Sequence, residues 1–304
     1  MRRALTARLA FALVLVMLAF IGVYLLTELA PGDALEDGLY SEGSMAAQRK
    51  ALGLDRSLPS RLTTRLLRLG ALDLGTSLRY DQPVLSLVAR RSVSTLQAGG
   101  AALLLALLIG IPAGVLASRS RSSVIRHAIS SISILLLSVP ALVVALVLGV
   151  IAAGAGIPAL AVMVISLALP AAATIERLQA RAMDAAQSEL CLDAARARGV
   201  PRHAITWRHA WPLSLPAVLG LVGTIAGQLL SGALAIELVT GRSGLGQLTF
   251  EALMARDVNL AAGCAAAVAA IVGLVTVTGD AVQLWMDPRV SLDGGTGGAG
   301  GSTP

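Results

Sequence analysis

The residues with the clearest chemical pattern form one polar, arginine-rich segment, 189–212, that interrupts long apolar sequence. Within it, Asp193-Ala194-Ala195 is followed, after three further residues, by Gly199. This pattern predicts a short helix over Asp193–Arg198, which Gly199 ends in the left-handed conformation, and a second helix that begins at Pro201. A compact helix–glycine–helix elbow with small alanine side chains is suited to docking into a cleft on a partner. The alternative interpretation is an ordinary basic loop held by lipid headgroups.

No comparable pattern supports catalysis. The histidines are His127, His203 and His209, which form no H-E-x-x-H motif, and the sequence has neither G-x-S-x-G nor a G-K-[ST] phosphate loop. The two cysteines, Cys191 and Cys264, are 73 residues apart in different predicted environments, so neither a disulfide nor a metal site is expected. We therefore predict no catalytic, cofactor-binding or metal-binding residue.

The composition is that of a membrane protein. Hydrophobic residues make up 56% of the chain, mean hydropathy is +0.77, and only 14% of residues are charged, against about a quarter in soluble domains. Four uncharged intervals hold 19, 27, 28 and 22 residues, beginning after Arg8, Arg91, Arg208 and Asp257. Each accommodates one helix of about 20 residues, the length that crosses ~30 Å of hydrocarbon.

A fifth uncharged interval lies between Arg126 and Glu176 and holds 49 residues. As a single helix it would be about 74 Å long at ~1.5 Å per residue, so it is predicted to be a hairpin of two spans with its turn at 153–158. The runs lack the alternating polarity of barrel strands, and backbone groups in lipid must pair internally. The predicted fold class is therefore all-α transmembrane with six spans.

Arginine distribution orients these spans. Arginines gather near the N-terminus, in the 118–126 loop, in the 176–210 loop and at Arg289 in the tail, all on one side of a six-span arrangement. Short positively charged loops stay in the cytosol, so these loops and both termini are predicted to be cytosolic, in a multi-pass protein of the inner (cytoplasmic) membrane. The net charge of +6 then reflects topology, and a nucleic-acid partner is not expected.

Three regions follow from this topology. Residues 1–93 hold the first span, interpreted as retained rather than as a cleaved signal peptide, and an extracytoplasmic region. In that region a helix beginning near Pro59 is predicted, with Leu62, Leu66 and Leu69 on one face. We interpret it as a spacer that lies on the membrane surface or caps the bundle; the alternative is a role in guiding substrate. Residues 94–290 hold five spans and the 176–210 loop. Residues 291–304 are Gly-rich and predicted to be disordered.

Few polar side chains interrupt the spans. Gln228 lies within the fifth span, and Asp280 and Gln283 lie near the cytosolic end of the sixth. Intramembrane polar groups are functional candidates by default, so Gln228 is a candidate pore-lining residue. Asp280 is close enough to the interface to reach it or to pair with an arginine, and we interpret it as structural.

The segment 189–212 resembles the E-A-A…G loop of importer permeases driven by ATP-binding cassette (ABC) subunits. Over nearly its whole length the chain is similar to the dipeptide/oligopeptide/nickel permease family of ABC importers, with motifs in the family's order and spacing. These motifs are Leu29-Ala-Pro-Gly-Asp33, Leu52-Gly-Leu-Asp55, Asp73-Leu-Gly-Thr-Ser-Leu-Arg79, Pro83-Val84, Gly110-Ile-Pro-Ala-Gly-Val-Leu-Ala117, Arg208-His-Ala210, Gly244-Leu-Gly246, Ala255-Arg-Asp257 and Asp287-Pro-Arg289. The chain departs from the family at Asp193, where the motif has Glu, and at Trp211-Pro212, where it has Leu-Pro.

The resemblance implies a six-helix importer permease bundle with a cytosolic coupling-helix loop, which is a transport subunit and not an enzyme. It implies a second related permease, two cytosolic ABC ATPases that bind the ATP, an extracytoplasmic substrate-binding protein and membrane lipid as partners. The implied substrate is a peptide, a similar small solute or a nickel complex. The residues implied in coupling to the ATPases are Asp193, Ala194, Ala195, Arg196, Arg198, Gly199 and Arg202.

The alternative from another class is an ion-coupled secondary transporter. Such a protein needs intramembrane coupling charges or inverted repeats, and the sequence shows neither clearly.

Overall fold

The computed structural model describes residues 2–29, 58–120 and 122–286, and its regular elements there are all helices. The predicted disordered tail and the motifs at 29–33, 52–55 and 287–289 therefore lie wholly or mostly outside the described residues. The elements are α1 (Arg2–Leu29), α3 (Leu58–Gly70), α4 (Val84–Arg119), α5 (Ser123–Ser138), α6 (Ala141–Ala155), α7 (Ala159–Gln187), α8 (Leu190–Ala197), α9 (Arg202–Ala204), the π-helix η1 (Ile205–Ala210), α10 (Trp211–Leu219), α11 (Val222–Thr240), α12 (Leu245–Met254) and α13 (Val258–Met286).

The membrane-spanning helices agree with the six predicted spans. Among the described residues, α1, α4, α7, α11 and α13 are each long and apolar enough to cross a membrane, and α5 with α6 makes a sixth, broken span. The predicted hairpin turn is confirmed, because α6 ends at Ala155, Gly156 takes a left-handed φ of 68°, and α7 begins at Ala159. Gly and Pro in this turn favour that reversal.

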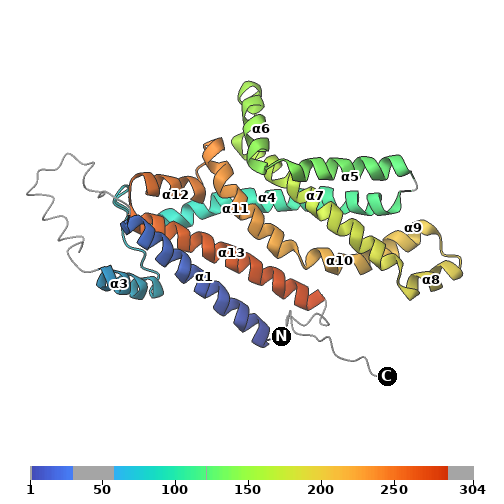
Figure 1. The fold of residues 1–304 in the computed structure, drawn as a ribbon, viewed down its shortest axis with the longest axis horizontal. Coiled ribbons are helices and arrows are strands. Elements are labelled where there is room, and N and C mark those ends of the chain that lie inside the picture. Colours follow the sequence, from blue (N-terminus) through green and yellow to red (C-terminus); the bar gives the residue numbers. More distant parts are fainter. Residues whose placement is uncertain (1, 30–57, 121, 287–304) are drawn as a thin grey trace, which may run out of the picture.

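The right-angled bend between α5 and α6 goes beyond the helix start or kink that Pro140 predicts within this apolar run. The two helices meet at 92° across Val139 and Pro140, and α6 projects steeply from the bundle (Figure 1). Proline restricts the residue before it to extended backbone, and Val139 has φ −101° and ψ 120°. The helix is therefore interrupted at Val139 and Pro140, although the apolar sequence continues on both sides.

The most extensive helix–helix contact in the bundle joins α4 to α7. A Cβ on Gly110 would lie 2.7 Å from the carbonyl oxygen of Ala172, and a Cβ on Gly114 would lie 2.5 Å from that of Glu176. Small residues allow two helix backbones to approach closely. The resulting van der Waals contacts hold helices together in lipid, where the hydrophobic effect does not drive their association. The buried core around this contact is built largely from alanines and aliphatic side chains of α4, α7 and α11.

At the predicted extracytoplasmic end, a buried carboxylate fixes the start of α12. Glu237 is fully buried and accepts hydrogen bonds from Thr95 Oγ1 at 2.5 Å and from the backbone N–H of Gly246 at 2.6 Å. The backbone N–H of Leu245 donates in turn to Thr95 Oγ1 at 3.0 Å. A Cβ on Gly244 would clash with the Glu237 carboxylate, so the Gly-Leu-Gly motif makes room for this cap.

A second buried carboxylate ties the 73–83 loop to the start of α13. Asp257 accepts from Ser77 Oγ at 2.6 Å, from the backbone N–H of Arg79 at 3.2 Å and from that of Leu260 at 3.0 Å. Nearby, Tyr80 donates to Glu251 of α12, and burial raises the pKa of the tyrosine so that it remains a donor. The two matching motifs at 73–79 and 255–257 are therefore one structural unit.

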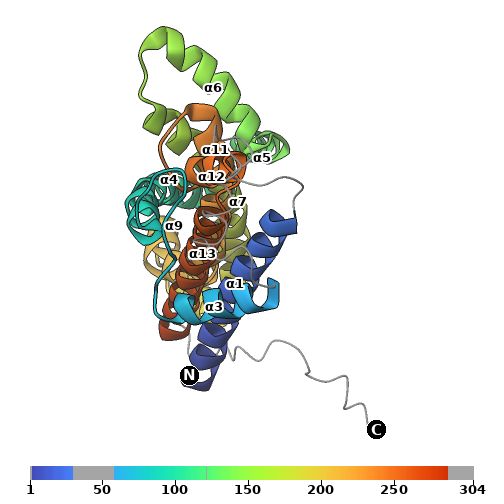
Figure 2. The same cartoon turned by 90° about the vertical axis from the view of Figure 1, so that its left-hand side faces the viewer.

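Helix α1 lies alongside α13, as Figures 1 and 2 show. Arg8 pairs with Asp280 at 2.8 Å, which confirms the structural interpretation of that aspartate. Near the other end, Phe20 and Tyr24 are buried and stack with ring centroids 6.2 Å apart. Leucines 62, 66 and 69 of α3 pack on this pair from one helical face, so the predicted amphipathic helix caps this end of α1 and α13.

The α4–α7 contact yields a matched pair of substitutions on one helix. Gly114→Ala is expected to lower the free energy of unfolding by about 1–3 kcal/mol, the usual cost of overpacking, because its Cβ meets backbone. Gly100→Ala is the control, since a Cβ there meets nothing within 4 Å and gains helix propensity. Thermal unfolding of both purified variants checks this. Equal melting temperatures would contradict the proposed backbone contact.

Candidate functional site

The loop predicted over 176–210 begins later than the charge pattern indicates, because α7 continues to Gln187. Residues 176–187 contain neither Gly nor Pro and are good helix formers. Glu176 is therefore not in a loop: it is only 4% exposed and accepts a hydrogen bond from Ser133 Oγ at 2.6 Å. The connection between α7 and α11 holds α8, α9, η1 and α10 within residues 188–219, and α10 already packs back on α7.

Helix α8 confirms the predicted short helix and begins three residues earlier, at Leu190. Its inner face carries Leu192 and Ala195, which are 0% and 7% exposed. They pack on a small hydrophobic core, which is completed by side chains from the ends of α4 and α7 and from η1, namely Val115, Met183, Ile205 and Ala210. The helix is thus held on the bundle by one apolar face, and its other face points away.

Gly199 ends α8 as predicted, with a φ of 76°. The backbone N–H of Gly199 donates to the carbonyl of Arg196 at 3.0 Å, and that of Val200 donates to the carbonyl of Ala195 at 3.2 Å. This pair of bonds is the Schellman arrangement, which satisfies the last carbonyls of a helix. A Cβ at Gly199 would meet nothing within 4 Å, so the left-handed backbone is the sole requirement for glycine there.

The second half of the elbow is more complex than the predicted single helix. Pro201, with φ −66°, precedes α9, and the helix then widens into η1 before it narrows again as α10. A π-turn accommodates one extra residue and often marks a functional position. Trp207 and Trp211 lie edge to face across it with ring centroids 5.9 Å apart, and Trp207 remains 55% exposed.

The structure brings the seven predicted elbow residues together but not with equal exposure. Ala195 faces the core, whereas Asp193, Arg196, Arg198 and Arg202 are exposed. Asp193 and Arg196 form an ion pair at 2.6 Å on the outer surface of α8. Because both side chains are largely exposed, solvent screens this pair and it adds little stability.

Sequence reasoning missed two exposed apolar side chains of the elbow. Leu190 is 85% exposed and Trp207 is 55% exposed. A large exposed apolar side chain on an otherwise polar, rigid element is typical of an interaction surface. The signal was present in the sequence as two bulky residues at the ends of the arginine-rich stretch.

The end of α7 that leads into the elbow is tied to the end of α4. Ser118 Oγ donates to Asp184 at 2.5 Å, and Arg119 Nη1 donates to Gln187 Oε1 at 2.8 Å. The sequence could not have indicated these bonds, since the partners are 66 and 68 residues apart and neither pair forms a motif.

Gln228, the predicted pore-lining residue, is exposed on α11. Thr224 and Ser231 are exposed too, four residues before and three residues after it. These spacings place the three side chains on one helical face. A span that aligns its polar side chains on an uncovered face is unsuited to contact with lipid there.

The bundle of apolar helices and the elbow define a membrane-spanning transport subunit, and comparison with known proteins agrees. Residues 110–292 match the family described as "Binding-protein-dependent transport system inner membrane component". The chain belongs to this family, the permease subunits of ABC importers. It is therefore a multi-pass transport component rather than an enzyme, and the ion-coupled alternative is set aside.

Relatives match along most of the chain. A putative peptide permease protein of Brucella suis biovar 1 (strain 1330) is 28% identical and covers 94% of this chain and 98% of its own. The probable D,D-dipeptide transport system permease protein DdpB of Escherichia coli K12 is 28% identical, with 90% and 92% covered. The oligopeptide transport system permease protein OppB of Salmonella typhimurium LT2 is 27% identical, with 72% and 76% covered.

The fold has a solved counterpart. An inward-facing structure of the MetNI methionine ABC transporter superposes with a TM-score of 0.60 at 20% identity, covering 67% of this chain and 97% of the compared chain. This likeness establishes the fold of the bundle.

Proposed function

We propose that this permease imports peptides and that the elbow, residues 188–219, docks it to cytosolic ABC ATPases. The observation that carries the docking proposal is the outer face of α8. This face presents Leu190 and the Asp193–Arg196 pair, while the inner face is locked to α4 and α7. A force applied to such an element moves the spans with it, because α8 has no freedom to slide on its core.

The proposed assembly contains a second related permease, two ATPase subunits that bind the ATP, and an extracytoplasmic substrate-binding protein, all surrounded by membrane lipid. The family's binding-protein-dependent description supports the last class of partner. The peptide assignment is supported by the names of three relatives, which are described as peptide, D,D-dipeptide and oligopeptide permeases.

We propose the same division of the chain as the sequence indicates: residues 1–93 for the first span and the extracytoplasmic region, 94–290 for the core permease domain and 291–304 for the tail. Both termini and the elbow are cytosolic in this proposal, because short arginine-rich connections stay on the cytosolic side.

The seven coupling residues divide into two roles in this proposal. Ala195 and Gly199 shape the elbow, by core packing and by left-handed backbone. The exposed Asp193, Ala194, Arg196 and Arg198 form the surface that meets the ATPase, and the exposed Arg202 borders this surface on the side of Arg119. Ala194 contributes a small side chain that permits close approach.

The docking proposal is tested by changing the elbow without changing the bundle. Gly199→Val strains the left-handed residue by ~1–2 kcal/mol, and Asp193→Lys reverses a surface charge. We expect both variants to reach the membrane at normal abundance but to retain about tenfold less ATPase on co-purification and to lose uptake.

The matched control for strain is Gly156→Val. Gly156 also has a positive φ with nothing within 4 Å of a Cβ, but it lies in the α6–α7 turn. Gly199→Asn is expected to restore ATPase association, since Asn tolerates the left-handed region. The docking proposal fails if Gly199→Val and Gly156→Val retain the ATPases equally.

Orientation is tested with the native cysteines. Cys191 is exposed on α8, and Cys264 is buried in α13. In spheroplasts that lack the ATPases, a membrane-impermeant maleimide is expected to spare Cys191 until the membrane is permeabilised. Ser243→Cys, at an exposed position in the α11–α12 loop, is expected to label at once. Labelling of Cys191 in intact spheroplasts, absent in Cys191→Ser, would reverse the proposed topology.

We further propose that Thr224, Gln228 and Ser231 of α11 line the substrate path. Gln228→Leu is expected to lower uptake several-fold while membrane abundance and ATPase association stay normal, because a peptide loses a hydrogen-bonding partner on its route. Val150→Ala, at a 78% exposed apolar position on α6, is the control for a lipid-facing change. Unchanged uptake with increased stability in Gln228→Leu would mean that this face contacts lipid.

A further inference from the structure

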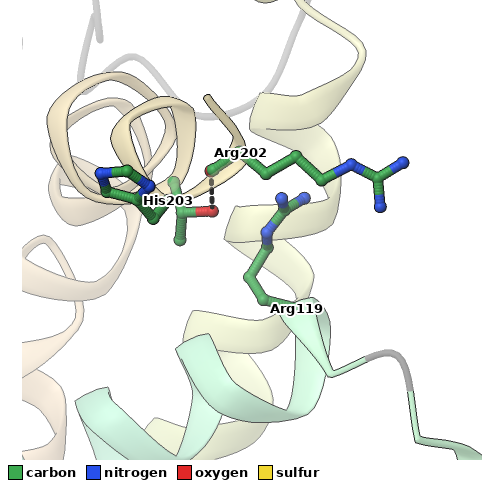
Figure 3. Close-up of a pocket in the computed structure, with 4 residues that line it drawn as sticks. Arg119, Arg202 and His203 are labelled. Carbon is green, nitrogen blue, oxygen red and sulfur yellow. Dashed lines mark hydrogen bonds between the residues drawn. The ribbon is translucent and has the colours of Figure 1, made fainter. Parts of the chain in front are cut away.

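An open cavity of about 330 Å³ lies between the end of α4 and the second half of the elbow. It is lined by Arg119, Arg202, His203 and Thr206 (Figure 3). The Arg119 side chain points toward the turn that carries Arg202, and the side chains of Arg202 and His203 extend to either side. Two guanidinium groups from distant parts of the chain thus converge on one cavity.

The positive charge of this cavity is poorly balanced. Neither Arg119 nor Arg202 forms an ion pair within the part of the chain that the structure describes. Arg119 Nη1 donates to the neutral Gln187 side chain, and its buried Nε has no acceptor. The carboxylate that acts on Arg119 is Asp184, which also accepts from Ser118 Oγ at 2.5 Å.

The elbow adds further positive charge near Arg119 and does not balance it. Arg196 and Arg202 both lie close enough to Arg119 for like charges to repel. Asp193 is paired with Arg196 on the outer face of α8 and so is engaged elsewhere. Arg202 is exposed to solvent, but the buried Nε of Arg119 has no acceptor, which costs free energy unless an anion compensates it.

We propose that this cavity binds a phosphate-type anion, held by Arg119 and Arg202 with His203 as a further polar contact. Guanidinium groups present planar forks of donors that match the oxygens of a phosphate. The Thr206 hydroxyl donates to the carbonyl of Arg202 at 2.9 Å, so it fixes the turn and leaves the arginines to supply the donors.

Two sources can supply this phosphate, and both fit the chemistry. The cavity opens where the apolar span α4 ends, which is the depth at which anionic phospholipid headgroups lie. A free inorganic phosphate reaches the same depth from the aqueous side. In either case the bound anion bridges α4 to the elbow and offsets the repulsion between their arginines.

The test measures anion binding directly, on the full chain purified with its partner subunits. Samples are reconstituted in nanodiscs of phosphatidylcholine with or without phosphatidylglycerol, and retained lipid is counted by native mass spectrometry. Arg119→Gln is expected to lower retained phosphatidylglycerol by about tenfold, the loss of one charge-assisted contact. Arg119→Lys, which keeps the charge but not the fork, is expected to retain an intermediate amount.

The control is Arg126→Gln, which removes an exposed arginine from α5 on the same side of the bundle, and is expected to retain the wild-type amount. Inorganic phosphate titrated into the lipid-free sample separates the sources: binding lost in Arg119→Gln, without lipid selectivity, assigns the site to a soluble anion. Co-purified ATPase and uptake are measured in the same samples, so failure of the docking proposal is seen separately. Equal retention of lipid and phosphate by Arg119→Gln and Arg126→Gln overturns the proposal. Unchanged anion binding with reduced ATPase association in Arg119→Gln also overturns it, since the arginines then serve a protein contact.

Discussion

The absence of side chains between α4 and α7 at Gly110 and Gly114 sets the geometry of the rest of the molecule. Backbone approaches backbone there, with Glu176 on the far side of the contact. Since the two helices cannot slide or roll without a clash, their ends nearest the elbow stay side by side. Val115 and Met183 can then form one apolar surface on which α8 packs, and Arg119 can reach Gln187. The elbow owes its fixed position to the absence of side chains at these two glycines, which lie within about one and a half turns of Val115.

Charged residues are scarce in this chain, and two buried carboxylates, those of Glu237 and Asp257, hold together segments that are distant in sequence. Glu237 joins α11 to α4 and to the start of α12, and Asp257 joins the loop before α4 to the start of α13. A buried carboxylate is costly unless its oxygens are fully hydrogen-bonded, so each such group specifies one arrangement of the loops around it. The apolar helices make up most of the bundle, and these few buried groups fix how its loops are arranged at the end opposite the elbow.

The spans, the hairpin turn and the helix-ending glycine could be predicted because each depends on local sequence. Uncharged intervals measure span length, and Gly156 and Gly199 need a backbone that other residues resist. The right-angled bend before Pro140 could not, since proline marks a kink, a cap or a corner alike. The π-helix at Ile205–Ala210 has no composition of its own. The convergence of Arg119 with Arg202 depends on helices packing across 83 positions of sequence, which no local pattern records.

The pairing of α1 with α13 makes the bundle's assembly depend on the order of synthesis. The first helix to enter the membrane has the last one as its neighbour, and about 230 residues separate the end of one from the start of the other. At ~5–20 residues per second, that interval is roughly 10–50 s. Throughout it Arg8 lacks the aspartate that it later pairs with, and Phe20 and Tyr24 lack the alanine-lined surface of α13 that covers them. The final span therefore completes the packing of the first. A chain whose synthesis stops before residue 258 leaves its first helix in the bilayer without the ion pair and the apolar contacts that α13 supplies.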